Sequence, residues 1–229
     1  MLSRCFPCVG LLPIILLASW PVAAADLDTY RGFELGASTA DVIARTAAAE
    51  RDVKTLHQRP ALLQELLWRP RDARGPNSAD PDSVAAIVFS FTDNQLFKMV
   101  INYERSRTAG LTNEDMITSL SAMYGPRSTR PAPTAPRPAF DSLNTPVVIA
   151  TWRQGDATLT LNQSTYGGFS LVITSIPLEA LARKAQATAV IMDAREAPAR
   201  EAARAKEQAD AARAAAEKTR TTNRDTFQP

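Results

Sequence analysis

A single histidine limits the catalytic chemistry available to this chain of 229 residues. His57 stands in the segment KTLHQR, and no nucleophile-elbow sequence places a serine in position to work with it. No set of histidine and acidic residues has metal-ligand spacing, and no glycine-rich phosphate loop is present. The residue types therefore predict a non-catalytic protein with no cofactor and no metal site.

Acidic residues remain as possible general acids or bases. Glu114 and Asp115 are adjacent, but both fall in the first turn of a predicted helix, where carboxylates cap the backbone and complement the helix dipole. Asp93 lies between two predicted strands and is interpreted as a turn residue. Both positions are better explained by local structure than by catalysis.

Aromatic and arginine side chains of the predicted sheet are the remaining candidates for function. Exposed Trp, Tyr and Arg are the residue types that dominate protein-binding surfaces. The alternative interpretation is that Trp152 and Phe169 simply fill the core. The candidate partner-binding residues are Tyr103, Trp152, Arg153, Tyr166 and Phe169.

An export signal is predicted at residues 1–25. Arg4 provides a positive start, residues 9–20 an apolar run, and Ala23, Ala24 and Ala25 the small residues that a signal peptidase accepts. Both cysteines, Cys5 and Cys8, lie inside this segment, so the mature chain would have neither disulfides nor thiol chemistry. We therefore expect a protein of the periplasm or the extracellular medium, and the abundance of Ala and Arg points to a bacterial source.

The charge balance argues against nucleic acid as a partner. The chain has 26 Lys and Arg residues against 24 Asp and Glu residues, without the excess of cations that nucleic-acid binding requires. No hydrophobic stretch after the signal approaches the roughly 20 apolar residues of a membrane helix. The sequence leaves the oligomeric state open.

An internal repeat organises the mature chain. The pattern G-x-[S/T]-x-x-D-[V/M]-I occurs at residues 36–43 and 110–117, with starts 74 residues apart. Each copy predicts a capped helix start, because Ser38 or Thr112 can accept from the amide three residues on. Trp68-Arg69 is matched later by Trp152-Arg153, and residues 97–101 by residues 169–173. The predicted units are 26–109 and 110–176.

Helices and strands follow from the hydrophobic period. Residues 39–50 and 113–124 predict helices, the second ending at Gly125-Pro126. Alternating segments predict strands at 84–91, 96–103, 147–152, 157–162 and 169–174. Leu62 to Trp68 has helical propensity, but its place in the repeat favours a strand. Long polar segments at 69–83 and 127–146 are interpreted as loops.

A helical arm rich in Ala, Arg and Glu is predicted at 177–220, followed by a frayed tail at 221–229. Leu178, Leu181, Ala185 and Met192 form a stripe that could pack on the domain. Beyond Pro198 the helix has no apolar seam, so a strong coiled coil is not expected. The arm is interpreted as a solvated helix, with a spacer or docking role as the alternative.

These features resemble a known family. A capped helix, the stop Tyr124-Gly125-Pro126, a Trp-bearing strand and two further strands resemble the small periplasmic outer-membrane assembly lipoproteins of the SmpA/OmlA type. The tandem arrangement is similar to that of the β-lactamase inhibitor protein type. The resemblance implies an α+β fold with helices on one face of an antiparallel sheet and the other face free for partners. The lipid-attachment cysteine, the first Gly-Pro stop and short loops are missing from this chain.

The leading functional hypothesis is a non-catalytic protein that binds another protein of the cell envelope in an assembly or adaptor role. A hydrolase-type enzyme without a recognisable motif and a lipid- or glycan-binding protein are the alternatives. An enzyme would show a deep pocket with convergent polar groups, and a ligand carrier an enclosed apolar cavity. A binding module would show an exposed aromatic patch on a shallow face.

Overall fold

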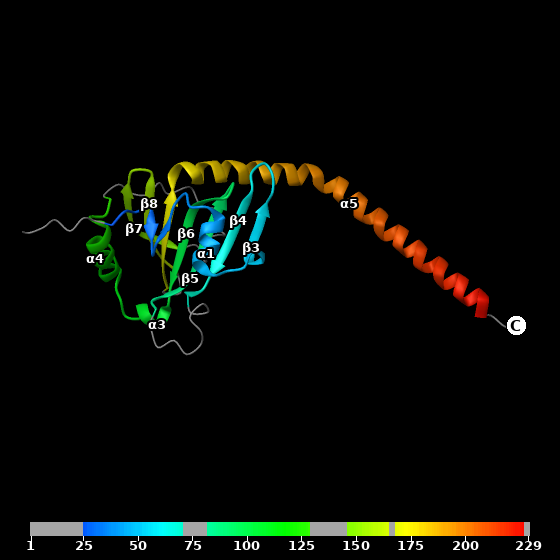
Figure 1. Cartoon of the computed structure of the whole chain (residues 1–229), viewed down its shortest axis with the longest axis horizontal. Coiled ribbons are helices and arrows are strands. Elements are labelled where there is room, and N and C mark those ends of the chain that lie inside the picture. The colour runs from blue at the N-terminus through cyan, green and yellow to red at the C-terminus, as the bar shows by residue number, and fades with distance from the viewer. Residues whose placement is uncertain (1–24, 71–81, 129–145, 165–167, 227–229) are drawn as a thin grey trace, which may run out of the picture.

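A computed structural model describes residues 25–70, 82–128, 146–164 and 168–226. The fold is α+β, with a seven-stranded sheet, a two-stranded sheet and a long C-terminal helix (Figure 1). The predicted signal therefore lies almost wholly outside the described residues, as do most of the two predicted polar loops. All strand pairs of the large sheet are antiparallel, in the order β3-β4-β5-β6-β9-β8-β7.

The first half of the chain contains one short helix and most of the strands. Its elements are β1 (Thr29–Tyr30), β2 (Phe33–Glu34), α1 (Thr39–Thr46), a 3-10 turn (Glu50–Asp52), β3 (Val53–His57), β4 (Leu63–Trp68), β5 (Val84–Thr92) and β6 (Gln95–Tyr103). The second half contains α3 (Arg105–Thr108), α4 (Asn113–Tyr124), β7 (Val147–Gln154), β8 (Ala157–Gln163), β9 (Phe169–Ser175) and α5 (Ile176–Thr226).

The predicted helix caps form as expected. The Ser38 hydroxyl accepts from the amide of Asp41, and α1 ends at Ala47, which adopts a left-handed conformation. Thr112 and Asp115 form a reciprocal capping box at the start of α4, and Gly125 ends that helix with φ of 82°. Helix α1 ends at Thr46 and is therefore shorter than the predicted helix, residues 39–50.

The predicted strands are also present. Leu62 to Trp68 resolves as strand β4, paired with β5 along its whole length. Asp93 and Asn94 both have positive φ, at 45° and 63°, as a two-residue hairpin turn between β5 and β6 requires. The sequence pattern does not predict β1, β2, β3 or α3, which are short or lack a clear alternation.

One face of the large sheet carries the main core, and we call it the covered face. Side chains from β5, β6, β8 and β9 alternate inward, among them Phe89, Met99, Leu159 and Leu171. Helices α1 and α4 and the segment with β1 and β2 pack on this face through Val42, Met116, Ile117, Leu120, Leu27 and Phe33. The helices of the two halves thus lie on the same side of the sheet.

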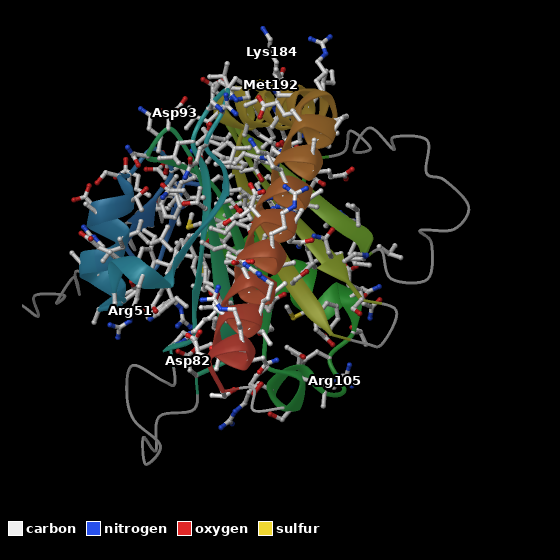
Figure 2. All side chains as sticks on the ribbon, turned by 90° about the vertical axis from the view of Figure 1, so that its right-hand side faces the viewer. Arg51, Asp82, Asp93, Arg105, Lys184 and Met192 are labelled. Carbon is white, nitrogen blue, oxygen red and sulfur yellow. The ribbon has the colours of Figure 1, made fainter. Side chains whose placement is uncertain are left out.

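Helix α5 packs on the opposite face, at one end of the strands. Ala182 forms a small cluster with Leu63 and Phe97, and Leu178 packs against it. Figure 1 shows the helix crossing the strand ends and continuing past β3, and Figure 2 shows Lys184 and Met192 above the strands. Helix α5 therefore lies on the face opposite to α1 and α4.

The contact stripe of α5 consists of alanines. Ala182, Ala185 and Ala189 are the buried side chains of the helix, whereas Leu181 of the predicted stripe is 60% exposed. Residues 221–226 are helical rather than frayed. No helix in the part of the chain that the structure describes is long and apolar enough to cross a membrane.

Candidate protein-binding face

The register of the sheet sorts its side chains into two faces, because directly paired residues point to the same side. Leu66 pairs with Phe89 on the covered face, so Leu67 and its partner Val88 point to the other face. We call this second side the open face, because among the described elements only α5 packs on it, at one end.

Two rows of side chains cross the open face. The apolar row is formed by directly paired residues from four adjacent strands, Leu67, Val88, Val100 and Val172, and continues into Thr160 and Thr151. The polar row crosses all seven strands and lies closer to α5 than the apolar row does. On β4, for example, the polar row contains Glu65, two residues before Leu67. Its members are Lys54, Glu65, Ser90, Lys98, Thr174, Thr158 and Arg153.

The apolar row is accessible to solvent. Leu67 is 47% exposed, and Val88, Val100 and Val172 are each partly exposed. The polar row is more varied: Ser90 and Thr174 are buried, whereas Lys54 and Arg153 are exposed and Glu65 and Lys98 are half-buried. The row therefore presents three cations and one carboxylate next to an aliphatic strip.

The structure separates the five predicted binding residues. Trp152 and Phe169 are 1% and 3% exposed and belong to the core of the covered face. The indole Nε1 of Trp152 donates to the carbonyl oxygen of Gly125 at 3.0 Å, which ties β7 to the end of α4. The expectation that these rings are available to a partner is thus wrong, because their strand positions alternate toward the helices.

Of the remaining three, one lies on the open face. Arg153 ends the polar row, whereas Tyr103 is half-buried and packs against the main core. Tyr166 lies outside the described residues. The exposed large apolar side chains of the described chain are aliphatic or methionine, not aromatic, and only Leu67 of the apolar row is among them.

Sequence reasoning missed the apolar row, although part of its signal is visible. Lys98, Val100 and Asn102 alternate with buried Met99 and Ile101, so one face of β6 reads as accessible. In β5, however, Val88 lies between Ile87 and Phe89, so both faces of the strand carry apolar residues. The sequence of β5 therefore does not indicate which face is covered.

Tyrosines near one end of the covered face form a separate polar cluster. Burial raises the pKa of Tyr30, and burial together with the neighbouring Tyr30 raises the pKa of Tyr103. Burial, followed by Tyr30, raises the pKa of Tyr124 to about 12. The three phenols therefore stay protonated at neutral pH, where they can donate hydrogen bonds but are poor bases.

An ion pair between a partly exposed arginine and a buried aspartate lies beside this cluster. The Arg31 guanidinium donates to both carboxylate oxygens of Asp82 at 2.8 Å, and Asp82 also accepts from the amide of Val84 at 2.9 Å. These hydrogen bonds to Asp82 raise the pKa of Arg31 above its ordinary value, against the effect of burial. The pair joins the β1–β2 turn to the start of β5.

His57 lies beside a network of ion pairs at the contact between the end of β3 and α5. Its Nδ1 lies 3.7 Å from Asp193, which also accepts from Arg200 at 3.1 Å, and Arg59 contacts both oxygens of Glu196. A cleft of 350 Å³ lies here between the end of β3 and α5, and none of its lining residues is a serine, threonine or cysteine. The network fastens α5 to the β3–β4 turn.

Two further clefts lie beside α5. One of 370 Å³ includes Asp26, Asp28 and Asp156, and one of 320 Å³ is lined largely by apolar atoms, with Pro60, Leu178 and Leu181 among its residues. No group of three or more histidine, cysteine or acidic residues able to hold a metal ion is found in the described ranges.

Comparison with known proteins adds no relative. No family model, no curated protein and no solved structure matches the chain.

Proposed function

We propose that this chain is an exported, non-catalytic protein that binds another protein of the cell envelope through the open face of its sheet. The accessible apolar row at Leu67, Val88, Val100 and Val172 carries this proposal. Aliphatic side chains gathered on one shallow face favour association with a second protein surface.

The proposed location outside the cytoplasm is based on the N-terminal sequence. Residues 1–25 have the charged start, apolar run and small residues of a secretory signal, which supports delivery to the periplasm or the medium. An adaptor there would use the domain as its binding module and α5 as a projecting arm. Residues 198–226 of that helix are exposed and span about 43 Å at 1.5 Å per residue.

The strand order supports a duplicated architecture of the SmpA/OmlA or β-lactamase inhibitor type. Helix α1 precedes β4, β5 and β6, and helix α4 precedes β7, β8 and β9. The two sets are arranged in mirrored order, with β6 and β9 paired at the centre. A duplicated unit of this kind would place both helices on one face and leave a continuous opposite face for a partner.

Protein binding is favoured over hydrolysis by the surroundings of His57. The histidine faces Asp193 and the cleft beside it offers no hydroxyl or thiol nucleophile among its lining residues. A Ser-His-Asp mechanism requires the nucleophile within hydrogen-bond distance of the imidazole. The ionic network at His57 instead fits a structural role in holding α5.

A double substitution on the apolar row tests the proposal. In Leu67→Asp/Val172→Asp, carboxylates replace one exposed and one half-exposed aliphatic side chain, and the two positions lie three strands apart, so the new charges do not face each other. We expect the purified variant to fold but to lose at least tenfold of the partner protein that the wild-type chain retains from its native envelope. An Ala212→Asp/Ala215→Asp variant on the exposed arm is the matched control, and equal retention by both variants would contradict the proposal.

A further inference from the structure

The apolar row runs in the same direction as α5. Each of its four residues comes from a different strand, so the row crosses β4, β5, β6 and β9. Helix α5 makes its contacts with β9, β6 and β5 before it reaches the β3–β4 turn (Figure 1). An elongated partner lying on the row would therefore lie alongside α5.

The distance from α5 to the row fits one helix. Leu63, which packs under α5, and Leu67, which begins the apolar row, are four residues apart on the same face of β4. Four residues of strand measure about 13 Å, and a helix with its side chains is about 10–12 Å wide. The row thus lies about one helix width from α5.

The length of the row also fits a short helix. Five strand spacings separate Leu67 from Thr151, where the row ends on β7, a distance of about 24 Å at about 4.8 Å per strand. A helix of about 16 residues covers the same distance. A flat sheet is a poorer fit, because α5 stands above the open face at one end and would block its approach.

The side of the apolar row that faces α5 carries charged side chains. The polar row lies between the apolar row and α5. Lys54 stands directly opposite the single carboxylate of the row, Glu65, whereas Lys98 on β6 and Arg153 on β7 have no carboxylate opposite them. Arg153 has no ion pair with another described residue, and the Lys98 ammonium lies 5.5 Å from the Phe97 ring centre. Carboxylates facing this row would meet Lys98 and Arg153.

We propose that an amphipathic helix of the partner, with an aliphatic stripe and acidic residues on the flank that faces Lys98 and Arg153, lies beside α5 and along the row from β4 to β7. This inference rests on the protein-binding function proposed above. A second copy of the chain is a poorer occupant, because its own open face would bring Lys98 and Arg153 against the same cations. Apolar burial supplies affinity, and the flanking charges set the orientation.

Site-specific photo-cross-linking tests the inference in cells that naturally produce the chain. A photoreactive residue replaces Val100 on the apolar row, and in the control chain it replaces Ala215 on the exposed arm. Mass spectrometry of the cross-linked peptide identifies the bound segment. We expect the Val100 position, and not Ala215, to capture a protein segment with aliphatic residues at helical spacing and Asp or Glu on one flank.

The captured segment is then synthesised and titrated against the purified full chain. Lys98→Glu/Arg153→Glu should weaken its binding about tenfold, whereas Arg204→Glu/Arg213→Glu, with the same charge change on the arm, should change it less than twofold. Lys98→Gln/Arg153→Gln, which only neutralises the charges, should give an intermediate loss. The melting temperature of each variant establishes that it is folded.

The outcomes separate the two proposals. A captured protein segment that is basic, or that forms a strand, overturns the acidic-helix inference and leaves the protein-binding function standing, as does charge reversal without effect on affinity. Capture of lipid, glycan or a second copy of this chain, or no capture at Val100, overturns both.

Discussion

At the scale of single residues, the buried carboxylate of Asp82 is the side chain on which local structure depends most clearly. It is 6% exposed and is held by two bonds from Arg31 and one from the Val84 amide. Removing this carboxylate would leave the Val84 amide without its acceptor, whereas the Arg31 side chain, which is 34% exposed, could be hydrated instead. These contacts anchor the β1–β2 turn, and with it Phe33, against the covered face.

We predict that Asp82→Ala lowers the free energy of unfolding by about 2 kcal/mol. The matched control is Asp210→Ala, which removes the carboxylate of an exposed ion pair with Arg213 on the arm and should cost less than about 0.5 kcal/mol. Urea denaturation followed by tryptophan fluorescence measures both. Similar losses in the two variants would show that the Arg31–Asp82 pair adds no stability of its own.

A second prediction at the scale of single residues concerns the contribution of Asp115 to the stability of the protein in acid. Hydrogen bonds from the backbone amide and hydroxyl of Thr112 hold the pKa of Asp115 below its ordinary value of 3.8. A carboxyl whose pKa is lowered by folding stabilises the protein above its unfolded pKa, and this contribution is lost as the pH falls through the folded pKa. Stabilisation by Asp115 is therefore complete at neutral pH and absent in strong acid.

Asp115→Asn should accordingly melt at a lower temperature than the wild-type chain at about pH 7, and the difference should shrink toward zero at about pH 2. Thermal unfolding by circular dichroism across this range checks the sign. A difference that stays constant with pH would mean that the amide substitution acts through packing and not through the charge of the capping box.

At the scale of elements, α5 is held to the sheet by small side chains. Ala182, Ala185 and Ala189 lie on its buried side, and short side chains allow close approach of the helix to Leu63 and Phe97. Beyond this contact Pro198 stands inside the helix, and Arg200 donates to the Asp193 carbonyl oxygen at 3.0 Å. Proline removes a helical hydrogen bond and bends a helix, in agreement with the change of direction in Figure 1.

Replacing Ala182, which packs against Leu63 and Phe97, by leucine tests this close contact. The larger side chain cannot fit without moving α5, and overpacking of this kind costs about 1–3 kcal/mol. Ala187→Leu, at an exposed position of the same helix, is the control and should leave stability nearly unchanged. Hydrogen exchange should report faster exchange in residues 176–197 for the first variant only, and equal exchange in both would contradict the alanine contact.

The ends of helices and the hairpin turn could be predicted from the sequence, because they depend on residues close together in the chain. Ser38 and Thr112 mark their helix starts, Gly125 marks a helix end, and Asp93-Asn94 marks the hairpin turn, because each acts through backbone atoms a few residues away. The position of Leu62 to Trp68 in the predicted repeat favoured a strand over its helical propensity, and β4 covers Leu63 to Trp68.

The orientation of side chains could not be predicted in the same way. Trp152 and Arg153 are neighbours in sequence and lie on opposite faces, and the choice depends on pairing with β8 and packing under α4. Aromatic residue type indicated a binding surface, whereas the register placed the rings in the core. The apolar row of the candidate face emerges only when the pairing of β4, β5, β6 and β9 is known.

At the scale of the whole molecule, the chain divides into a sheet domain and an arm. Residues 198–226 are exposed along their whole length, whereas residues 182–189 contribute to a buried cluster. The arm therefore adds helix without adding contacts to the domain. Its stability should be independent of the stability of the sheet.

Truncation at two points separates these parts. Ending the chain after Glu201 should leave the melting temperature of the domain within about 2 °C of the full chain, because surface changes of this kind are close to neutral. Ending it after Ile176 should lower the melting temperature clearly, since Leu63 and Phe97 lose their cover. Differential scanning calorimetry measures both, and equal effects would contradict the division.

The proposed function depends on the open face being covered by a partner. The most direct test is to measure how far the apolar row is protected from chemical labelling in cells. A cysteine introduced at Val172 on the apolar row is labelled with a maleimide in producing cells and in the purified chain, and mass spectrometry quantifies the labelled peptide. A cysteine at Ala215 on the arm is the control. We predict that Val172→Cys is labelled at least tenfold less in cells than after purification, with Ala215→Cys labelled alike in both. Equal labelling of Val172→Cys in cells and in the purified chain would contradict the account.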